Sequence, residues 1–121
     1  MGIAKENFYS VNSRSLACKI SHSEIVYFHS RKMKTTFHLI CGAIYSVSKN
    51  IGMVHGEINK PLTFIKIDRS IVINLAHVKW YEKKSGRTIV MKNNHALTVS
   101  KREKPKVLKA YFRHNPRTSA K

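Results

Sequence analysis

Most of the side chains in this sequence that could do chemistry are cations, and they are grouped. Arg31, Lys32 and Lys34 form the first group, and Lys66 and Arg69 form the second. The third group consists of Lys101, Arg102, Lys104, Lys106 and Lys109. Ammonium groups bind phosphates, and the planar guanidinium also fits the edges of bases. This pattern favours recognition of a polyanion.

The net charge indicates which polyanion. The 23 Lys and Arg residues outnumber the 6 Asp and Glu residues, which gives a formal charge of +17 and a pI near 10.3. Such an excess destabilises a compact chain by self-repulsion, and a nucleic-acid partner is the usual reason for it. A fourth group at a predicted hairpin tip, Lys83, Lys84 and Arg87, we interpret as solvated surface.

The sequence offers few residue patterns that could support catalysis. The acidic residues occur singly, so the sequence lacks the paired carboxylates of a two-metal nuclease or a glycosidase. It also lacks the G-x-S-x-G and H-E-x-x-H motifs and a phosphate-binding glycine loop. We therefore expect no enzymatic activity, no small-molecule substrate and no cofactor.

Histidines and cysteines give no sign of a metal site. The seven histidines show no ligand spacing, and only two cysteines occur. We expect Cys18 and Cys41 to be small buried apolar residues.

The elements that position the cations are predicted to be short strands. Apolar residues recur with a period of two in short runs, within a length that suits one domain. These runs predict strands at 16–20, 25–28, 36–41, 44–47, 63–67, 78–83, 88–92 and 96–99. Gly86, Asn93 and Asn94 favour hairpin turns, so 78–99 is predicted to form an antiparallel meander.

Two short helices are also expected. The stretch "SKNIGMVHGEI" predicts one that is capped by Ser48 and packs through Ile51, Val54 and Ile58. A second is predicted to start around Pro105. Its packing residues would be Val107, Leu108, Tyr111 and Phe112.

The run "FIKIDRSIVIN", residues 64–74, places Arg69 in the middle of an apolar row. In one continuous strand the guanidinium would be buried with the isoleucines, at a cost of several kcal/mol without a partner. We therefore predict that the chain turns near Asp68 and that Arg69 faces an anion. No stretch approaches the roughly 20 apolar residues of a spanning helix, and no leader follows Met1, so we expect a cytoplasmic protein.

The same run, with the meander and "LTVSKRE" after it, resembles the LytTR DNA-binding domain, the output module of many bacterial response regulators. The stretches "EIVYFHSRKMKTTFHL" and "YSVSKNIGMVHGEI" extend the resemblance over 16–112. Residues 1–15 would be an N-terminal extension and 113–121 a basic C-terminal tail. The resemblance implies a mostly β fold, an elongated set of small antiparallel sheets with one or two short helices.

The resemblance also implies where DNA would bind, through loops that enter successive major grooves. The implied DNA-binding residues are Arg31, Lys32, Lys34, Thr35, Lys66, Arg69, Ser100, Lys101 and Arg102. Arginine suits guanine, whereas lysine suits phosphates. Asn74 would bond the backbone, and Asp68, which replaces a usual histidine, could accept from cytosine N4.

The implied function is that of a sequence-specific transcription regulator of double-stranded DNA. Relatives often bind direct repeats as two copies, and some are controlled by a membrane-bound antagonist. Residues 1–15 leave no room for a receiver domain, so we expect a stand-alone regulator. A structural RNA-binding protein of ribosomal type fits the charge equally well, and competition with unrelated duplex and RNA separates the two classes.

Overall fold

The computed structural model describes residues 8–13, 16–58, 63–82 and 84–114. The strands are β1 Phe8–Ser13, β2 Leu16–Ser21, β3 Ile25–Arg31, β4 Lys34–Leu39, β5 Ile44–Val47, β6 Phe64–Asp68, β7 Ile71–Asn74, β8 Val78–Tyr81, β9 Thr88–Met91 and β10 Ala96–Thr98. The helices are α1 Ile51–Ile58 and α2 Lys104–His114. The predicted mostly β class is confirmed.

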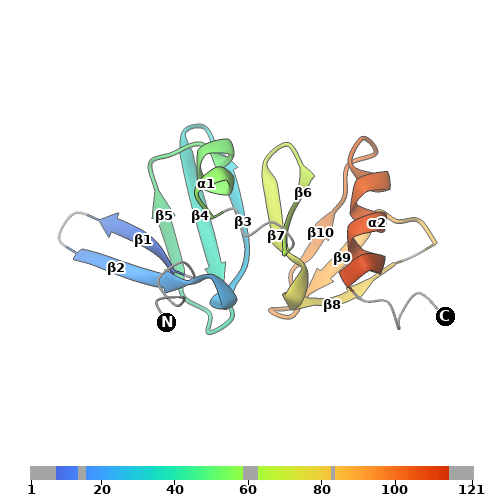
Figure 1. Cartoon of the computed structure of the whole chain (residues 1–121), viewed down its shortest axis with the longest axis horizontal. Helices are drawn as coiled ribbons and strands as arrows, with labels where there is room; N and C mark the ends of the chain where they lie inside the picture. Colours follow the sequence, from blue (N-terminus) through green and yellow to red (C-terminus); the bar gives the residue numbers. More distant parts are fainter. Residues whose placement is uncertain (1–7, 14–15, 59–62, 83, 115–121) are drawn as a thin grey trace.

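The strands form three antiparallel sheets that lie in a row (Figure 1). The β1–β2 hairpin is at one end, and the sheet β10-β9-β8 with α2 is at the other. Between them is the sheet β5-β4-β3-β7-β6, in which β7 pairs with β3 although α1 and two strands separate them in sequence. This order brings residues near 30 beside residues near 70.

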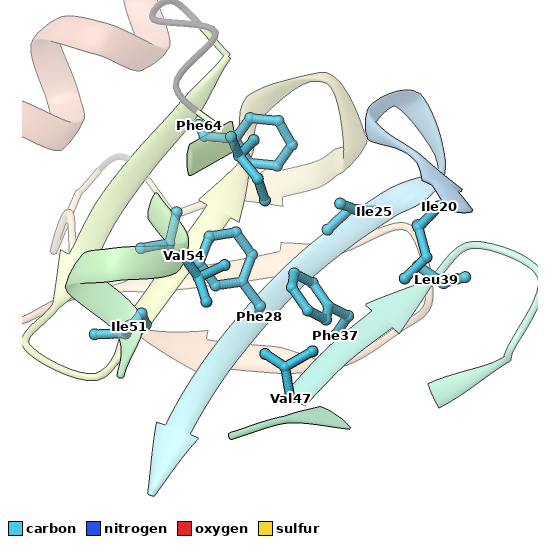
Figure 2. Close-up of a cluster of buried hydrophobic side chains, with 11 residues drawn as sticks. Ile20, Ile25, Phe28, Phe37, Leu39, Val47, Ile51, Val54 and Phe64 are labelled. Atoms are coloured by element: carbon cyan, nitrogen blue, oxygen red, sulfur yellow. The ribbon is translucent and has the colours of Figure 1, made fainter. Parts of the chain in front are cut away.

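The central sheet is buried on both faces. One core, below α1, contains Phe28, Phe37 and Val54 with their neighbours, as Figure 2 shows. The next residues along β3 and β7, Tyr27 and Ile73, belong to a second core. Strands covered on both faces have continuous apolar sequences, which explains the apolar run Ile71, Val72 and Ile73 of β7.

The second core joins the central sheet to the meander and α2. Ile67, Ile89 and Val107 are fully buried in it, and the ring of Tyr81 meets that of Tyr111 edge to face at 5.1 Å. The predicted packing face of α2 is confirmed: Val107 and Tyr111 are buried, and Leu108 and Phe112 pack partly against the core.

The helix cap of α1 differs from the prediction. The amide of Met53 donates to Oδ1 of Asn50 at 2.9 Å, so Asn50 caps the helix and the exposed Ser48 does not. Asn50 immediately precedes Ile51, the first helical residue, and its side chain reaches the third amide as an N-cap does. The predicted packing face, Ile51, Val54 and Ile58, is buried.

Residues 8–13, which lie in the predicted N-terminal extension, form β1 and pair with β2, and this strand was not among those predicted. The burial predicted for Cys41 needs correction. Cys41 is exposed, because β4 ends at Leu39 and the amide of Gly42 closes a turn on the Leu39 carbonyl at 2.9 Å. The side chain of Cys18 lies outside the described residues.

Of the three residues predicted to favour hairpin turns, two have the positive φ that such turns require. Gly86 and Asn94 have φ of 65° and 71°, while Asn93 does not have a positive φ. A Cβ at Gly86 would also lie 2.6 Å from Cε of Lys104, but that flexible side chain can move, so the positive φ is the main reason for glycine here.

Candidate nucleic-acid interface

The run from Phe64 to Asn74 is not one continuous strand, because the chain turns at the position of Arg69. β6 ends at Asp68, Arg69 and Ser70 form the turn, and the Arg69 side chain is exposed. A β-bulge precedes the turn, since Lys66 pairs with Val72 while Asp68 pairs with Ile71. The predicted two-element arrangement is confirmed.

The β3–β4 hairpin lies beside this turn. Because β7 is antiparallel to β3, the end of β3 meets the start of β7, and the amide of Ser30 donates to the Ser70 carbonyl at 3.0 Å. The first cationic group therefore adjoins the second.

The loop between β10 and α2 lies on the other side of the β6–β7 turn. The amide of Ser100 donates to the Ile67 carbonyl, in the bulge of β6, at 2.8 Å. Oγ of Ser100 accepts from the amide of Glu103 at 3.2 Å, which orients Lys101 and Arg102 at the start of α2. Residues 31–34, 68–71 and 100–103 thus form one surface, which we call the three-loop edge; Figure 1 shows these loops along its upper side.

Part of the three-loop edge is hollowed. A depression of about 500 Å³ is lined by Lys66, Asp68, Arg69, Ser100, Arg102 and Glu103. It brings Arg69 and Arg102, which are 33 positions apart in sequence, to the walls of one site. The sequence predicted both arginines as functional but could not show that they share a site.

The structure places most of the predicted residues at the surface of this edge. The exposed members are Arg31, Lys32, Lys34, Lys66, Arg69, Lys101 and Arg102. Ser100 is partly buried, and its hydroxyl accepts the hydrogen bond from the Glu103 amide.

Thr35 is the exception, and its prediction as a contact residue is wrong. Its side chain is 0% exposed, and Oγ1 donates to the carbonyl of Lys49 at 2.7 Å. Alternation along β4 places Thr35 on the same face as Phe37 and Leu39, toward the core. That alternation was visible in the sequence and would have excluded Thr35.

The tip of the β3–β4 hairpin holds a residue that the sequence analysis missed. Lys32 and Met33 form a two-residue turn, in which Lys32 has φ of 58° and Met33 is 63% exposed. A non-glycine residue at positive φ is strained by roughly 1–2 kcal/mol. The hairpin tip therefore presents the apolar side chain of Met33 among exposed cations.

Asn74 has the structural role that the resemblance implied. It is 2% exposed, its Nδ2 donates to the Ile25 carbonyl at 2.9 Å, and its Oδ1 accepts from the amide of Ala76 at 3.0 Å. These bonds fix β7 to the start of β3 and to the turn that follows. Asn74 therefore supports the three-loop edge from within.

A cluster of histidines joins the central sheet to the β9–β10 turn. Nε2 of His29 and Nε2 of His38 are hydrogen-bonded at 3.0 Å, and Oη of Tyr27 bonds Nδ1 of His95 at 2.8 Å. Burial, reinforced by the neighbouring His29 and His95, lowers the pKa of His38 to about 4. Burial also lowers the pKa of His29, with a smaller effect from His95. Burial therefore favours the neutral forms of His29 and His38.

Other kinds of site are not apparent in the part of the chain that the structure describes. Among those residues no group of three or more His, Cys, Asp or Glu side chains could hold a metal ion. None of the described helices is long and apolar enough to cross a membrane.

Comparison with known proteins identifies the family. The sequence model of the LytTr DNA-binding domain matches residues 16–112, most of the chain. The chain belongs to the LytTR DNA-binding domain family. Members of this family bind DNA in transcription regulation, and the resemblance seen in the sequence is confirmed. The RNA-binding alternative receives no support from this match.

A solved LytTr structure shows the same fold. The LytTr DNA-binding domain of a Bacillus cereus protein is similar to this chain at 17% identity and a TM-score of 0.73. The similarity covers 86% of this chain and 95% of the other. No curated protein matches the chain.

Proposed function

We propose that this LytTR chain is a sequence-specific transcription regulator that binds the major grooves of double-stranded DNA through its three-loop edge, without catalytic activity. The single observation that carries the proposal is the pair of backbone hydrogen bonds, Ser30 to Ser70 and Ser100 to Ile67, that unites three cationic loops. Loops that are tied to one another in this way present their cations at fixed spacing. Fixed spacing is what a regular helical polyanion requires.

Different cations take different roles. Arg69 and Arg102, on the walls of the hollow, offer planar forks that match guanine O6 and N7. Lys32, Lys66 and Lys101 are exposed point charges that suit phosphates, where they position the protein without specifying sequence. Arg31 and Lys34, which flank the hairpin tip, add two more cations that suit phosphates.

The wider arrangement follows the family. We propose that two copies bind direct repeats, that the protein works in the cytoplasm, and that a membrane-bound antagonist is one means of control.

The test uses a duplex selected from a random pool by the unaltered protein. Arg69→Ala and Arg102→Ala should each weaken binding to this duplex by about 1–3 kcal/mol and relax base preference at one position. Arg113→Ala, which removes an exposed arginine at the far end of α2, is the matched control. The proposal fails if RNA or random duplex displaces the selected duplex, or if all three variants lose affinity equally on every sequence.

A further inference from the structure

Asp68 is an acid within a strongly basic surface. It ends β6, is partly buried, and lines the same hollow as Lys66, Arg69 and Arg102. A carboxylate that faces a phosphate is repelled, so its presence there weakens binding to any duplex unless a donor meets it. The hollow therefore contains a group that opposes indiscriminate binding.

The backbone holds this carboxylate in place. The bulge makes Ile67 the extra residue of β6, and the Ile67 side chain is 0% exposed. The Ile67 carbonyl accepts the amide of Ser100 at 2.8 Å, so the residue before Asp68 is fixed on both sides. Bulges of this kind redirect the following side chain. Asp68 is directed toward the hollow by the fold.

The two acids that line the hollow differ in their partners. Glu103 lies 3.7 Å from Nζ of Lys106, and its side chain is only 13% exposed. The Asp68 carboxylate makes no hydrogen bond or ion pair with any residue that the structure describes, although two arginines line the same hollow. Its acceptor sites are open to a ligand, whereas Glu103 is already engaged.

The base edges of the major groove offer one kind of donor that suits this carboxylate. Cytosine presents its N4 amino group alone, whereas adenine presents N6 beside the acceptor N7, which repels an anion. The neighbouring Arg69 is suited to guanine, the opposite member of the same type of base pair. Asp68 and Arg69, which are consecutive in the chain, can then select a cytosine and a guanine that are next to each other.

We propose that Asp68 is a specificity-determining residue that selects cytosine through its N4 amino group and penalises duplexes without cytosine at that position. This inference rests on the proposed function. It adds a repulsive component to recognition, since the wrong sequence leaves a charged carboxylate without a donor.

Three variants test the role of Asp68: Asp68→Ala, Asp68→Asn and, as the control with the same charge change, Glu24→Gln, at an exposed residue that precedes β3 and lies at the opposite end of that strand from the hairpin tip. Dissociation constants are measured for the selected duplex, for each single base-pair substitution of it, and for random duplex. Asp68→Ala should weaken selected-site binding by about 5- to 150-fold, the equivalent of one base contact. The same variant should strengthen random-duplex binding by roughly 3- to 10-fold, because a like charge is gone.

Asp68→Asn gives a sharper signature. An amide pairs with adenine N6 and N7, so the preference at one position should move from cytosine toward adenine. Glu24→Gln, outside the three-loop edge, should leave both the base preference and the ratio of selected to random affinity unchanged. Thermal unfolding of each variant verifies that the fold is retained.

Two results would overturn the inference. One is that Asp68→Ala and Glu24→Gln change selected and random binding by the same factor. The other is that Asp68→Ala relaxes preference only at the position relaxed by Arg69→Ala, which would make Asp68 a positioning residue for Arg69. Failure of the proposed function is seen separately and earlier, because the unaltered protein would then enrich no duplex from the pool.

Discussion

At the scale of single residues, the three-loop edge combines side chains for binding with strained or buried ones that support it. Lys32 is exposed yet held at φ of 58°, and Thr35, three positions further on, is fully buried. Strain of this kind persists where the surrounding structure imposes it, and it gathers at functional sites. We therefore expect the Lys32 side chain to contribute to DNA binding and the Thr35 side chain to contribute to stability.

Lys32→Gly and Lys32→Ala separate charge from backbone strain. Both should weaken DNA binding on all sequences and reduce the slope of log Kd against log salt by about 0.9, the value for one phosphate. Only glycine relieves the positive φ, so its variant should be more stable than the alanine variant by about 1 kcal/mol. Urea denaturation and salt titration measure these effects. An unchanged salt slope in both variants would exclude Lys32 from the interface.

Thr35→Val should act on stability alone. Valine keeps the shape but removes the bond from Oγ1 to the Lys49 carbonyl, so the free energy of unfolding should fall by about 1 kcal/mol. DNA affinity measured well below the melting temperature should stay the same. Loss of affinity at unchanged stability would return Thr35 to the contact residues.

At the scale of elements, strand patterns were easier to predict than connections between strands. Alternation located the strands from 16 onward except β7, Ile71–Asn74, and the misplaced cation at Arg69 correctly indicated the turn before it. β1 was missed because half of the residues in "FYSVNS" are serine or asparagine, which are typical of turns. The bonds that unite the three loops join backbone amides and carbonyls of Ser30, Ser70, Ser100 and Ile67, for which side-chain types carry no signal.

The histidine cluster makes the junction of two sheets sensitive to acid. Because the folded-state pKa of His38 lies near 4, below the unfolded value of about 6.5, its contribution to stability is complete above pH 6.5 and is lost as the pH falls toward 4. Solvent screening limits the loss to roughly 1–2 kcal/mol.

Replacement of the titrating group tests this linkage. His38→Gln should show a smaller drop in urea midpoint between pH 7 and pH 5 than the unaltered protein, since one titrating group is gone. The neighbours His29, His95 and Tyr27 remain in both proteins, so the difference isolates His38. An equal or larger drop in the variant would show that His38 is not responsible.

At the scale of the whole molecule, the chain has a formal charge of +17, and the fold brings three of its cationic groups to one side. The β4–β5 loop and the β9–β10 turn lie along the opposite side in Figure 1. That side carries exposed apolar residues, Ile40 and Ile44, at 42% and 59%. The three-loop edge, where backbone hydrogen bonds tie three cationic loops together, suits a polyanion better than this side does.

Chemical-shift changes in the backbone amides during titration with the selected duplex test this assignment most directly. We expect the largest changes in residues 31–34, 68–71 and 100–103, all at the same stoichiometry, because one duplex meets all three loops together. The largest changes at the β4–β5 loop and the β9–β10 turn, or changes confined to a single loop of the three, would contradict the assignment of the three-loop edge as the DNA interface.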